Sequence, residues 1–539
     1  MVQTERGRRP CVRIEHLWPL LALCAVFTFT STHPIRPNDF WWHLKAGQLI
    51  ATSGRIPAVD TFSHTMAGTP YNNYAAFWLM EVFYYITYTA GGPALIVFTH
   101  SLLVTAAYAM LLHICRGVAS SWRVAAAATI FAVVLGFNNW NVRPQAVSFP
   151  AGAAVLWAVY GYRARPRRWL LAVPPIALLV WVNSHGSFVV GLLVLGIWLA
   201  DETAAAVSSR LAGRKGGSAA RLLAPAGVFA ASTLACLLNP RGPRALAYVA
   251  ALSGNEVIRS MVPEWAAPTF GQWHGTLFLA ALLSTAVLLA VSPRRPGFFH
   301  LSAYVAFGAL ALSSSRGIVW FGIAMAPVVA EHLAALAGAI RRSPRTEAAG
   351  HGLPALNYLF ATLMLAAAVL SLPWLKGLLP LPEKKAGLVF SETPVAATQF
   401  LLDRRLPLPI FNEQAFGSYL IWAAQPQYPV FIDTRLELYP LAIWQDYLAI
   451  SAGREGWQGL LDRYGVKTLM LSPSSQAGLI AALRNSADWQ MVYEDRAATI
   501  YVRAGATTNS QPHRTSQAGS PPHSSTRPSA RTSTTSGSP

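Results

Sequence analysis

The stretch PALIVFTHSLLVTAAYAMLLHIC, residues 93–115, contains no Asp, Glu, Lys or Arg. A helix needs about 20 mostly apolar residues to cross a bilayer, so this segment is long enough to span one. Comparable apolar stretches occupy residues 17–33, 122–137, 146–162, 169–183, 187–201, 222–238, 275–292, 298–313, 317–338 and 354–375. The sequence therefore predicts an α-helical polytopic membrane protein with about eleven transmembrane helices.

The composition of the 539 residues agrees with this class, because 53% are hydrophobic and only 12% are charged. Soluble proteins have about 25% charged residues. The net charge of +19 is carried mainly by short loops and by the C-terminal tail. Since no domain-sized basic face is present, we do not expect a nucleic-acid partner. The four cysteines form no CxxC motif or Cys/His cluster, so no structural zinc site is expected.

The orientation follows from the Lys and Arg residues of alternate loops, which concentrate on the cytoplasmic side of membrane proteins. One set of loops, beginning with the N-terminus, carries nineteen of them, whereas the opposite set carries eight over longer loops. The N-terminus is therefore predicted to be cytoplasmic. An odd number of spans then places the C-terminal domain outside.

The segment YAAFWLMEVFYYITYTA, residues 74–90, is apolar and aromatic. If it spanned the membrane, every later loop would change sides and the basic cluster at 163–168 would face outward. We therefore interpret it as an interfacial or re-entrant helix, for which its Trp and Tyr residues are suited.

The chain divides into four predicted regions. Residues 1–16 form a basic cytoplasmic N-terminus, and residues 17–375 form the transmembrane domain with a first outer loop at 34–92. Residues 376–503 form a small extracytoplasmic α/β domain, in which strands at 406–412, 428–433, 466–472 and 499–503 alternate with helices and predict a largely parallel sheet. The tail at 504–539 is rich in Ser, Thr, Pro and Gly and is predicted to be disordered.

With this topology, the polar motifs fall at the outer ends of the helices. They are NDFWWHLKAG (38–47), RIPAVDTFSHT (55–65), NNWNVRPQ (138–145), NSHG (183–186), NPRGPR (239–244), PEW (263–265) and SSSRG (313–317). Polar groups at membrane depth are costly and usually face a cavity or one another. Their convergence predicts an active or binding site at the outer surface of the membrane.

Three residues of the first outer loop are candidates for catalysis. Asp39 opens an amphipathic stretch; it could be the helix N-cap, but Asn38 could serve equally well and leave Asp39 free. Asp60 is a second acid or, with more weight, the cap of the turn after Pro57. His43 could share a helix face with Asp39, or it could be an ordinary solvated histidine.

Five further residues are candidates for substrate binding. Glu81 lies in an apolar helix, where an unpaired carboxylate would be costly, so we expect it to pair with an outer arginine. The sparse outer arginines lie beside Pro or Gly at helix ends and suit a bidentate phosphate contact, or else lipid anchoring and pairing with acids. His185 could join the site or make only a helix-end hydrogen bond. The three sparse outer arginines are Arg143, Arg241 and Arg316.

DFWWHLKAG resembles the acidic first-loop motif of oligosaccharyltransferase catalytic subunits and lipid-linked-sugar transferases of the GT-C superfamily of glycosyltransferases. RIPAVDTFSHT, NSHG, NPRGPR and FIDTRLELYP (431–440) are similar to segments of uncharacterised bacterial membrane proteins associated with this superfamily. The architecture covers residues 1–503, but the motif match is confined to the first loop. No WWDYG-like motif is present, so protein N-glycosylation is not expected.

The resemblance implies a GT-C-like transmembrane domain and transfer of a sugar from a polyprenyl-phosphate donor to an envelope acceptor, among membrane lipids. Asp39 would be the base or acceptor-orienting carboxylate, and the outer arginines would bind the phosphate. Some members hold a divalent cation (Mg²⁺ or Mn²⁺), which Asp39, Asp60 and Glu81 could bind, but we assign no metal site. A transporter or flippase, a polysaccharide polymerase and a noncatalytic scaffold remain alternatives.

Overall fold

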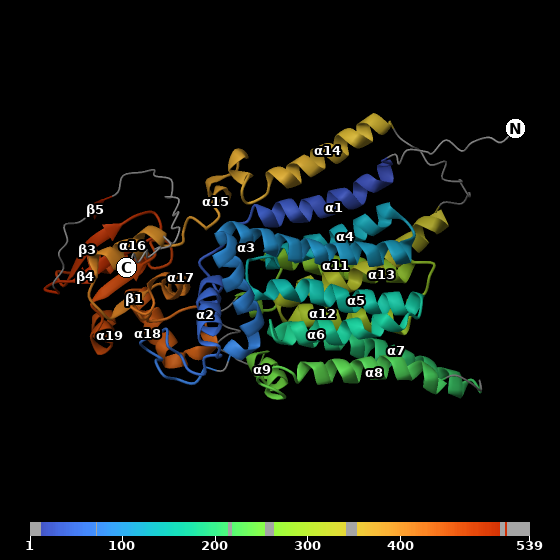
Figure 1. Ribbon diagram of the computed structural model, residues 1–539, viewed down its shortest axis with the longest axis horizontal. Helices are drawn as coiled ribbons and strands as arrows, with labels where there is room; N and C mark the ends of the chain where they lie inside the picture. Colours follow the sequence, from blue (N-terminus) through green and yellow to red (C-terminus); the bar gives the residue numbers. More distant parts are fainter. Residues whose placement is uncertain are drawn as a thin grey trace, which may run out of the picture.

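The computed structural model describes residues 12–71, 73–213, 218–253, 263–340, 353–506 and 513–514. Long helices lie side by side in a bundle, and a smaller unit that contains the sheet lies at one end of it (Figure 1). Within these described ranges, six helices are long and apolar enough to cross a membrane, and four shorter apolar helices accompany them. Each of the predicted spans coincides with a helix, but the number eleven stays a prediction. Most of the predicted disordered tail lies outside the described residues.

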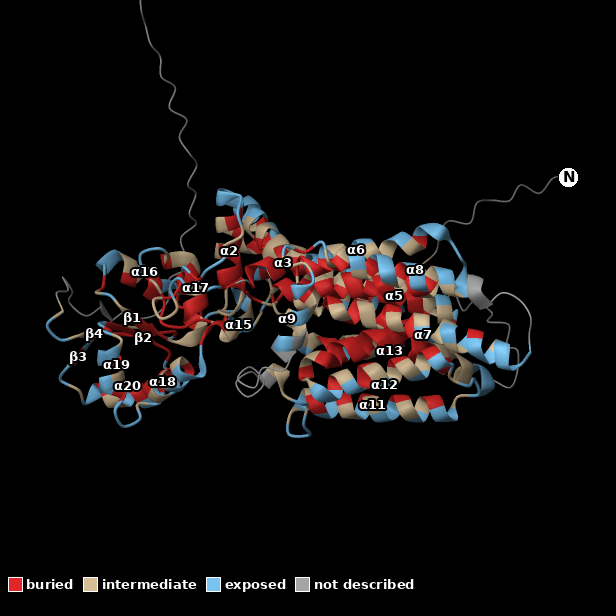
Figure 2. Cartoon of the chain, turned by 90° about the horizontal axis from the view of Figure 1, so that it is seen from below, coloured by how far each residue is buried: buried red, intermediate tan, exposed pale blue. Residues whose placement is uncertain are grey.

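The bundle is built from helices with outward-facing apolar side chains around a buried centre. Every residue from Ile318 to Ala330 of the central helix is buried, whereas Leu283 and Val305 on two outer helices are 64% and 66% exposed (Figure 2). Such exposed apolar surface suits contact with lipid. The helices are α1 (Ile14–Ser31), α3 (Tyr74–Ala119), α4 (Trp122–Gly136), α5 (Ser148–Ala164), α6 (Val173–Val182), α7 (Val189–Leu211), α8 (Ser218–Cys236), α11 (Trp273–Val291), α12 (Phe298–Ser313), α13 (Ile318–Ile340) and α14 (Pro354–Leu370).

The helix α3 is bent at Gly91 and Gly92, whose backbones are not helical. Gly92 has φ +60°, a conformation that only glycine adopts readily, and Pro93 follows it. The first part of α3 packs beside α2 (Phe40–Ser53) at the end of the bundle, and the remainder runs along the bundle (Figure 1). The segment 74–90 is thus a separate arm of α3, while its position relative to the membrane stays a prediction.

Successive helices run in opposite directions, so the loops alternate between the two ends of the bundle. The helix α1 runs toward the end that carries the smaller unit (Figure 1). The loops that follow α1, α4, α6, α8 and α12 therefore share that end. These loops carry the polar motifs that were predicted to lie together on one side of the membrane.

The C-terminal unit contains a five-stranded mixed sheet in the order β1-β2-β4-β3-β5. The pairs β1–β2 and β3–β5 are parallel, but β2–β4 and β3–β4 are antiparallel, so the prediction of a largely parallel sheet is wrong. The strands are β1 (Ile410–Asn412), β2 (Thr468–Leu471), β3 (Trp489–Glu494), β4 (Thr499–Arg503) and β5 (His513–Arg514). The helices are α15 (Glu383–Ala386), α16 (Val395–Arg404), α17 (Gln414–Ala424), α18 (Leu441–Ser451), α19 (Trp457–Arg463) and α20 (Ala477–Arg484).

The prediction of a sheet strand at 428–433 is also wrong, because this segment pairs with the first outer loop instead. The amide of Val430 donates to the carbonyl of Phe62 (2.9 Å), and the amide of His64 donates to the carbonyl of Val430 (3.0 Å). Trp42, Phe62 and Tyr74 belong to the same buried cluster as the core of the C-terminal unit. The first loop and the C-terminal unit therefore share one hydrophobic core, which fixes them against each other.

Candidate active site

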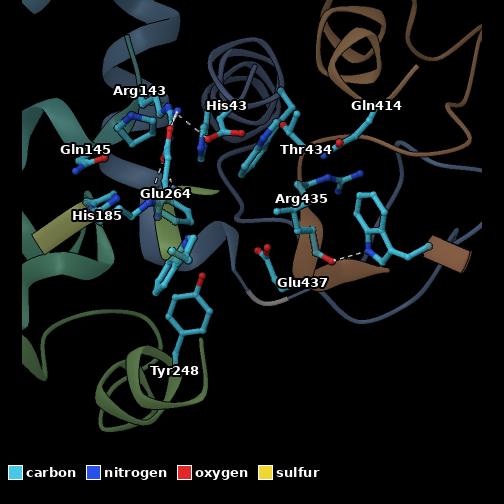
Figure 3. Close-up of a pocket in the computed structure, with 18 residues that line it drawn as sticks. His43, Arg143, Gln145, His185, Tyr248, Glu264, Gln414, Thr434, Arg435 and Glu437 are labelled. Atoms are coloured by element: carbon cyan, nitrogen blue, oxygen red, sulfur yellow. Dashed lines mark hydrogen bonds and ion pairs between the residues drawn. The ribbon is translucent and has the colours of Figure 1, made fainter. Parts of the chain in front are cut away.

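A cleft lies where the polar end of the bundle meets the C-terminal unit (Figure 3). Its enclosed volume of about 320 Å³ lies at the lower end of the range for small-molecule sites. Both domains supply its walls. The lining residues are Asp39, Trp42, His43, Phe77, Arg143, Pro144, Gln145, His185, Tyr248, Glu264, Trp265, Arg316, Gln414, Thr434, Arg435, Leu436, Glu437 and Trp444.

Asp39 occupies the N-cap position of α2, but its side chain makes no capping hydrogen bond. Its backbone is already helical, with φ −50° and ψ −30°, a geometry that an N-cap residue does not usually adopt. The carboxylate is 29% exposed in the cleft, and Oδ2 lies 3.9 Å from Nε of Arg143. The capping interpretation is therefore wrong, and the carboxylate faces the cleft beside a guanidinium.

Arg143 and Arg316 converge on the carboxylate of Glu264, which belongs to the 3-10 turn Pro263–Trp265. Arg143 binds it in bidentate fashion, with distances of 2.9 and 2.7 Å, and Arg316 adds two contacts of 3.2 and 3.1 Å to Oε2. Burial alone would raise the pKa of the Glu264 carboxyl, but the two guanidiniums lower it to about 2. The two arginines therefore form an anion-binding site, which the carboxylate of Glu264 occupies.

His43 forms a buried pair with Glu81, in place of the arginine partner predicted for Glu81. Nδ1 of His43 lies 2.8 Å from Oε1 of Glu81, and the side chains are 4% and 0% exposed. The indole of Trp42 packs on the imidazole, with ring centroids 3.5 Å apart. Burial, together with His185, Arg435 and Arg143 nearby, holds the pKa of His43 well below its usual range. His43 lines the cleft, whereas Glu81 lies behind it.

His185 both lines the cleft and makes the helix-end hydrogen bond that was its alternative. Its Nδ1 accepts from the amide of Ser187 at 3.2 Å and lies 2.7 Å from that residue's hydroxyl. Burial, followed by the fields of Arg316 and Arg143, lowers the pKa of His185 to about 3. The side chain is therefore a neutral imidazole at physiological pH.

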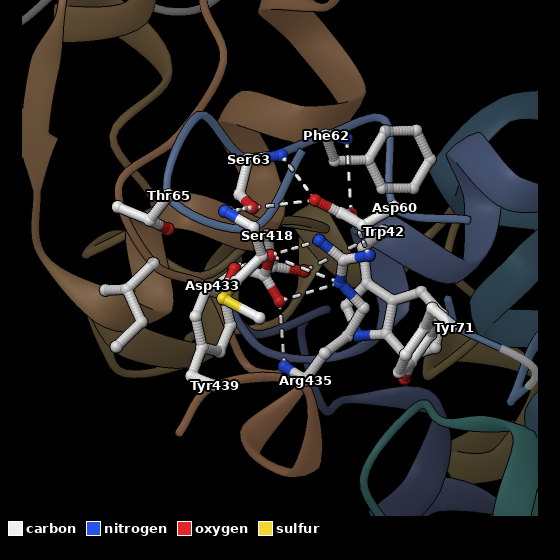
Figure 4. A network of polar contacts seen from close by, with 12 residues as sticks. Trp42, Asp60, Phe62, Ser63, Thr65, Tyr71, Ser418, Asp433, Arg435 and Tyr439 are labelled. Atoms are coloured by element: carbon white, nitrogen blue, oxygen red, sulfur yellow. Dashed lines mark hydrogen bonds and ion pairs between the residues drawn. The ribbon is translucent and has the colours of Figure 1, made fainter. Parts of the chain in front are cut away.

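Asp60 lies outside the cleft, in a fully buried network with Arg435 and Asp433 (Figure 4). Its carboxylate accepts from the amides of Phe62 and Ser63, which is the turn-capping role that was given more weight. It also accepts from Nη1 of Arg435 at 2.6 Å. With all its partners inside the protein, Asp60 joins the first loop to the C-terminal unit and does not face a substrate.

Arg241 also lies outside the cleft wall. Its guanidinium stacks on the ring of Tyr248, 4.2 Å from the centroid, and Tyr248 in turn lines the cleft. Burial lowers the pKa of Arg241. Of the eight candidate residues, the structure brings five to one cleft and leaves three behind it. The five are Asp39, His43, Arg143, His185 and Arg316, and the three are Asp60, Glu81 and Arg241.

The C-terminal wall of the cleft was not predicted. It comes from the segment FIDTRLELYP, which was noted only for its similarity to segments of other membrane proteins. The lining residues of this wall are Thr434, Arg435, Leu436 and Glu437. Arg435 is fully buried. Burial alone would lower its pKa, but Asp433, together with Tyr74 and Tyr439, raises it. The available signal was a set of charges of alternating sign at every second position, Asp433, Arg435 and Glu437.

The described residues do not converge as a divalent-cation site requires. Asp60 and Glu81 are committed to Arg435 and His43, and no group of three His, Cys, Asp or Glu side chains with metal-binding geometry occurs in the described ranges. The three acids that could have bound a divalent cation, Asp39, Asp60 and Glu81, are thus dispersed.

No protein-family model and no curated protein sequence matches the chain. Among solved structures, it is similar to a mycobacterial arabinofuranosyltransferase, AftD, with a TM-score of 0.52 and 14% identity over 90% of this chain. It spans 40% of the length of AftD. The oligosaccharyltransferase of Archaeoglobus fulgidus matches with a TM-score of 0.48, 12% identity, and coverage of 92% of this chain and 74% of that one.

ArnT from Cupriavidus metallidurans, solved with undecaprenyl phosphate bound, gives a TM-score of 0.45 and 13% identity, covering 90% of this chain and 98% of that one. Similarity at this level of identity establishes the fold, and here the match to AftD carries it. The chain has the fold of this arabinofuranosyltransferase, AftD, over the matched region.

Proposed function

We propose that the protein is a membrane glycosyltransferase that transfers a sugar from a polyprenyl-phosphate donor to an acceptor of the cell envelope. One observation carries the proposal: two arginines from different helix ends converge on a single anion inside a cleft, with the Asp39 carboxylate beside them, 3.9 Å from Nε of Arg143 and free of any capping hydrogen bond. The fold shared with AftD supports the reaction class.

The pair Arg143 and Arg316 suits the phosphate of the donor. Both guanidiniums are held at helix ends, and together they direct four hydrogen bonds at the Glu264 carboxylate. A phosphate diester presents two anionic oxygens with similar spacing, and planar guanidiniums bind such groups in bidentate fashion. The side chain of Glu264 marks the place that the donor phosphate would take.

Asp39 suits the deprotonation of the acceptor. The acceptor oxygen forms a bond to the anomeric carbon, and the bond from that carbon to the phosphate oxygen breaks with its electron pair. Polyprenyl phosphate departs as an anion that the arginines stabilise, so no general acid is required. The acceptor proton passes to the Asp39 carboxylate, which faces the cleft without a capping bond, and from there to water.

The arrangement of charge favours an enzyme over a transporter or flippase. The cleft and its ionisable groups lie at one end of the bundle, whereas transporters place their sites near the bilayer midplane. From the distribution of arginines, we assign this end to the outer face of a bacterial plasma membrane and the N-terminus to the cytoplasm. The sugar-bearing lipid would enter from the outer leaflet.

Binding of undecaprenyl phosphate to the full-length protein in nanodiscs tests the anion site. Arg143→Gln and Arg316→Gln should each weaken binding by about 10- to 100-fold, since a hydrogen bond to a charged group contributes about 1.5–3 kcal/mol. Arg241→Gln is the matched control, because Arg241 lies behind the cleft, and its affinity should stay within about twofold of the unmodified protein's.

Each arginine substitution leaves Glu264 with one partner fewer, so it should also be made together with Glu264→Gln to preserve folding. Unchanged affinity in both folded double variants would remove the two arginines from donor binding. Equal weakening by Arg241→Gln would show that overall positive charge, and not this site, attracts the lipid.

A further inference from the structure

The His43–Glu81 pair is a buried ionisable pair beside the cleft. Glu81 is 0% exposed, and its second oxygen, Oε2, has no hydrogen-bond partner in the described part of the chain. The backbone carbonyl of Glu81 also lies against Gly47, where an added Cβ would come within 1.9 Å. The α2–α3 contact therefore leaves Glu81 little freedom to turn toward water.

The number of protons on this pair decides what His43 presents to the cleft. A carboxylate with one unpartnered oxygen in an apolar setting is costly, so the pair is stable when its net charge is zero. Two arrangements satisfy this condition: a carboxylic acid that donates to a neutral imidazole at Nδ1, or a carboxylate that accepts from an imidazolium. Both place a hydrogen atom on Nε2. That nitrogen is bare only in a net-negative pair, or when the carboxyl proton sits on Oε2, where it would find no acceptor in the described part of the chain.

The remaining ring nitrogen is Nε2, because Nδ1 is bound to Glu81. The imidazole lines the cleft, and Figure 3 shows His43 between Arg143 on the membrane-domain side and Thr434 on the C-terminal side. The indole of Trp42, tilted by 30° against the imidazole, and the edge-on ring of Phe77 hold its plane. The side chain is therefore fixed in position before a substrate arrives.

We infer that His43 donates a hydrogen bond from Nε2 to the phosphate group of the donor substrate, with Glu81 as the residue that positions it. The inference rests on the proposed function of the cleft. His43 then supplements the guanidiniums of Arg143 and Arg316 as a donor aimed at an oxygen whose negative charge grows as the sugar departs. Asp39 keeps the role of base, which an imidazole that already carries hydrogen on Nε2 cannot perform.

Two amide substitutions distinguish the ring nitrogens. Glutamine places its amide nitrogen near the position of Nε2, whereas the shorter asparagine places it near Nδ1. In nanodiscs, His43→Gln should bind undecaprenyl phosphate within about threefold of the unmodified protein, and His43→Asn should bind it about tenfold or more weakly. Glu81→Gln should retain affinity, because its amide can still hydrogen-bond to Nδ1 and leave hydrogen on Nε2.

Sugar transfer from polyprenyl-phosphate sugars extracted from the native membranes provides the second measurement. The inference predicts that His43→Gln keeps most of the transfer rate and that His43→Asn loses it. If His43 were instead a base, both variants would lose transfer equally while both kept their affinity for undecaprenyl phosphate, and the inference would be overturned.

The arginine variants separate this inference from the proposed function. If Arg143→Gln and Arg316→Gln weaken lipid binding but His43→Asn does not, the anion site stands and the role of His43 falls. If none of these variants alters lipid binding, the proposed function of the cleft fails first. Size-exclusion profiles in detergent confirm that each variant is folded before its affinity is compared.

Discussion

Replacing Arg435 with methionine should loosen the C-terminal unit from the first outer loop. Arg435 binds Asp433 through Nη2 at 2.6 Å and Asp60 through Nη1 at 2.6 Å, and Nη1 also donates to the hydroxyl of Tyr74 at 3.0 Å. The guanidinium and both carboxylates are fully buried. Methionine fills a similar volume but leaves two acids without their shared cation.

Removing one partner of a buried ion pair costs about 3–5 kcal/mol, because the other charge remains uncompensated. Each acid keeps part of its hydrogen bonding, Asp60 to Ser63 and Asp433 to the hydroxyl of Tyr439, so we expect a cost within this range and not twice it. An increase of that size raises the population in which the unit has separated from the loop by roughly 150- to 5,000-fold.

Limited proteolysis of the full-length protein in nanodiscs measures that population, with cleavage followed at the junction between the first loop and the C-terminal unit. Arg435→Met should be cleaved much faster than the unmodified protein. The triple variant Asp60→Asn, Asp433→Asn, Arg435→Met removes all three charges and should regain most of the protection, because neutral groups are far less costly to bury than unpaired charges.

Equal protection of Arg435→Met and the unmodified protein would refute this reasoning, since it would show that the apolar core shared by the two regions holds them together without the ion pairs. Failure of the triple variant to recover would show that the geometry of the network, and not its charge balance, is what matters.

Two further predictions concern the cleft and its frame. Since the pKa of Glu264 is lowered to about 2, its ion pairs stabilise the protein above the ordinary pKa of glutamate and are lost as the pH falls toward 2. Protease protection of its loop should therefore be constant from pH 8 to about pH 5 and fall below about pH 4, and Glu264→Gln should remove this acid dependence. Gly47→Ala should lower the free energy of unfolding by about 1–3 kcal/mol, because its Cβ would strike the backbone carbonyl of Glu81. Gly117→Ala, a helical glycine with open space around it, is the control and should be tolerated in a thermal-shift assay.

The convergence of the site was predictable because it depends on topology. Asp39, Arg143, His185 and Arg316 each follow or precede an apolar stretch that ends on the same side of the bundle, so their shared location follows from counting spans. Loops at one end of a helix bundle can meet only a limited set of neighbours. That geometry brought four of the expected side chains, and His43 with them, into one cleft.

The residues that were misplaced depend on contacts between distant parts of the chain. Asp60 is bound by Arg435, 375 positions later in the sequence, and Glu81 by His43 across two helices. The segment at 428–433 has the composition of a strand, but it pairs with the first loop and not with the sheet. Local patterns carry no signal for such partners, because each requires the tertiary arrangement of the shared core.

Sugar transfer in the cleft, as proposed, depends on Asp39 as the base. The most direct test compares the unmodified protein with Asp39→Asn, both in nanodiscs, using polyprenyl-phosphate sugars extracted from the native membranes as donors and native envelope material as acceptor. Mass spectrometry follows the loss of the donor and the gain of sugar on the acceptor.

We predict that Asp39→Asn binds undecaprenyl phosphate nearly as well as the unmodified protein but transfers sugar at least about 100-fold more slowly, the scale at which positioned acid–base groups contribute. Transfer at the rate of the unmodified protein would contradict the assignment of Asp39. The absence of any transfer by the unmodified protein with these donors would contradict the proposed function itself.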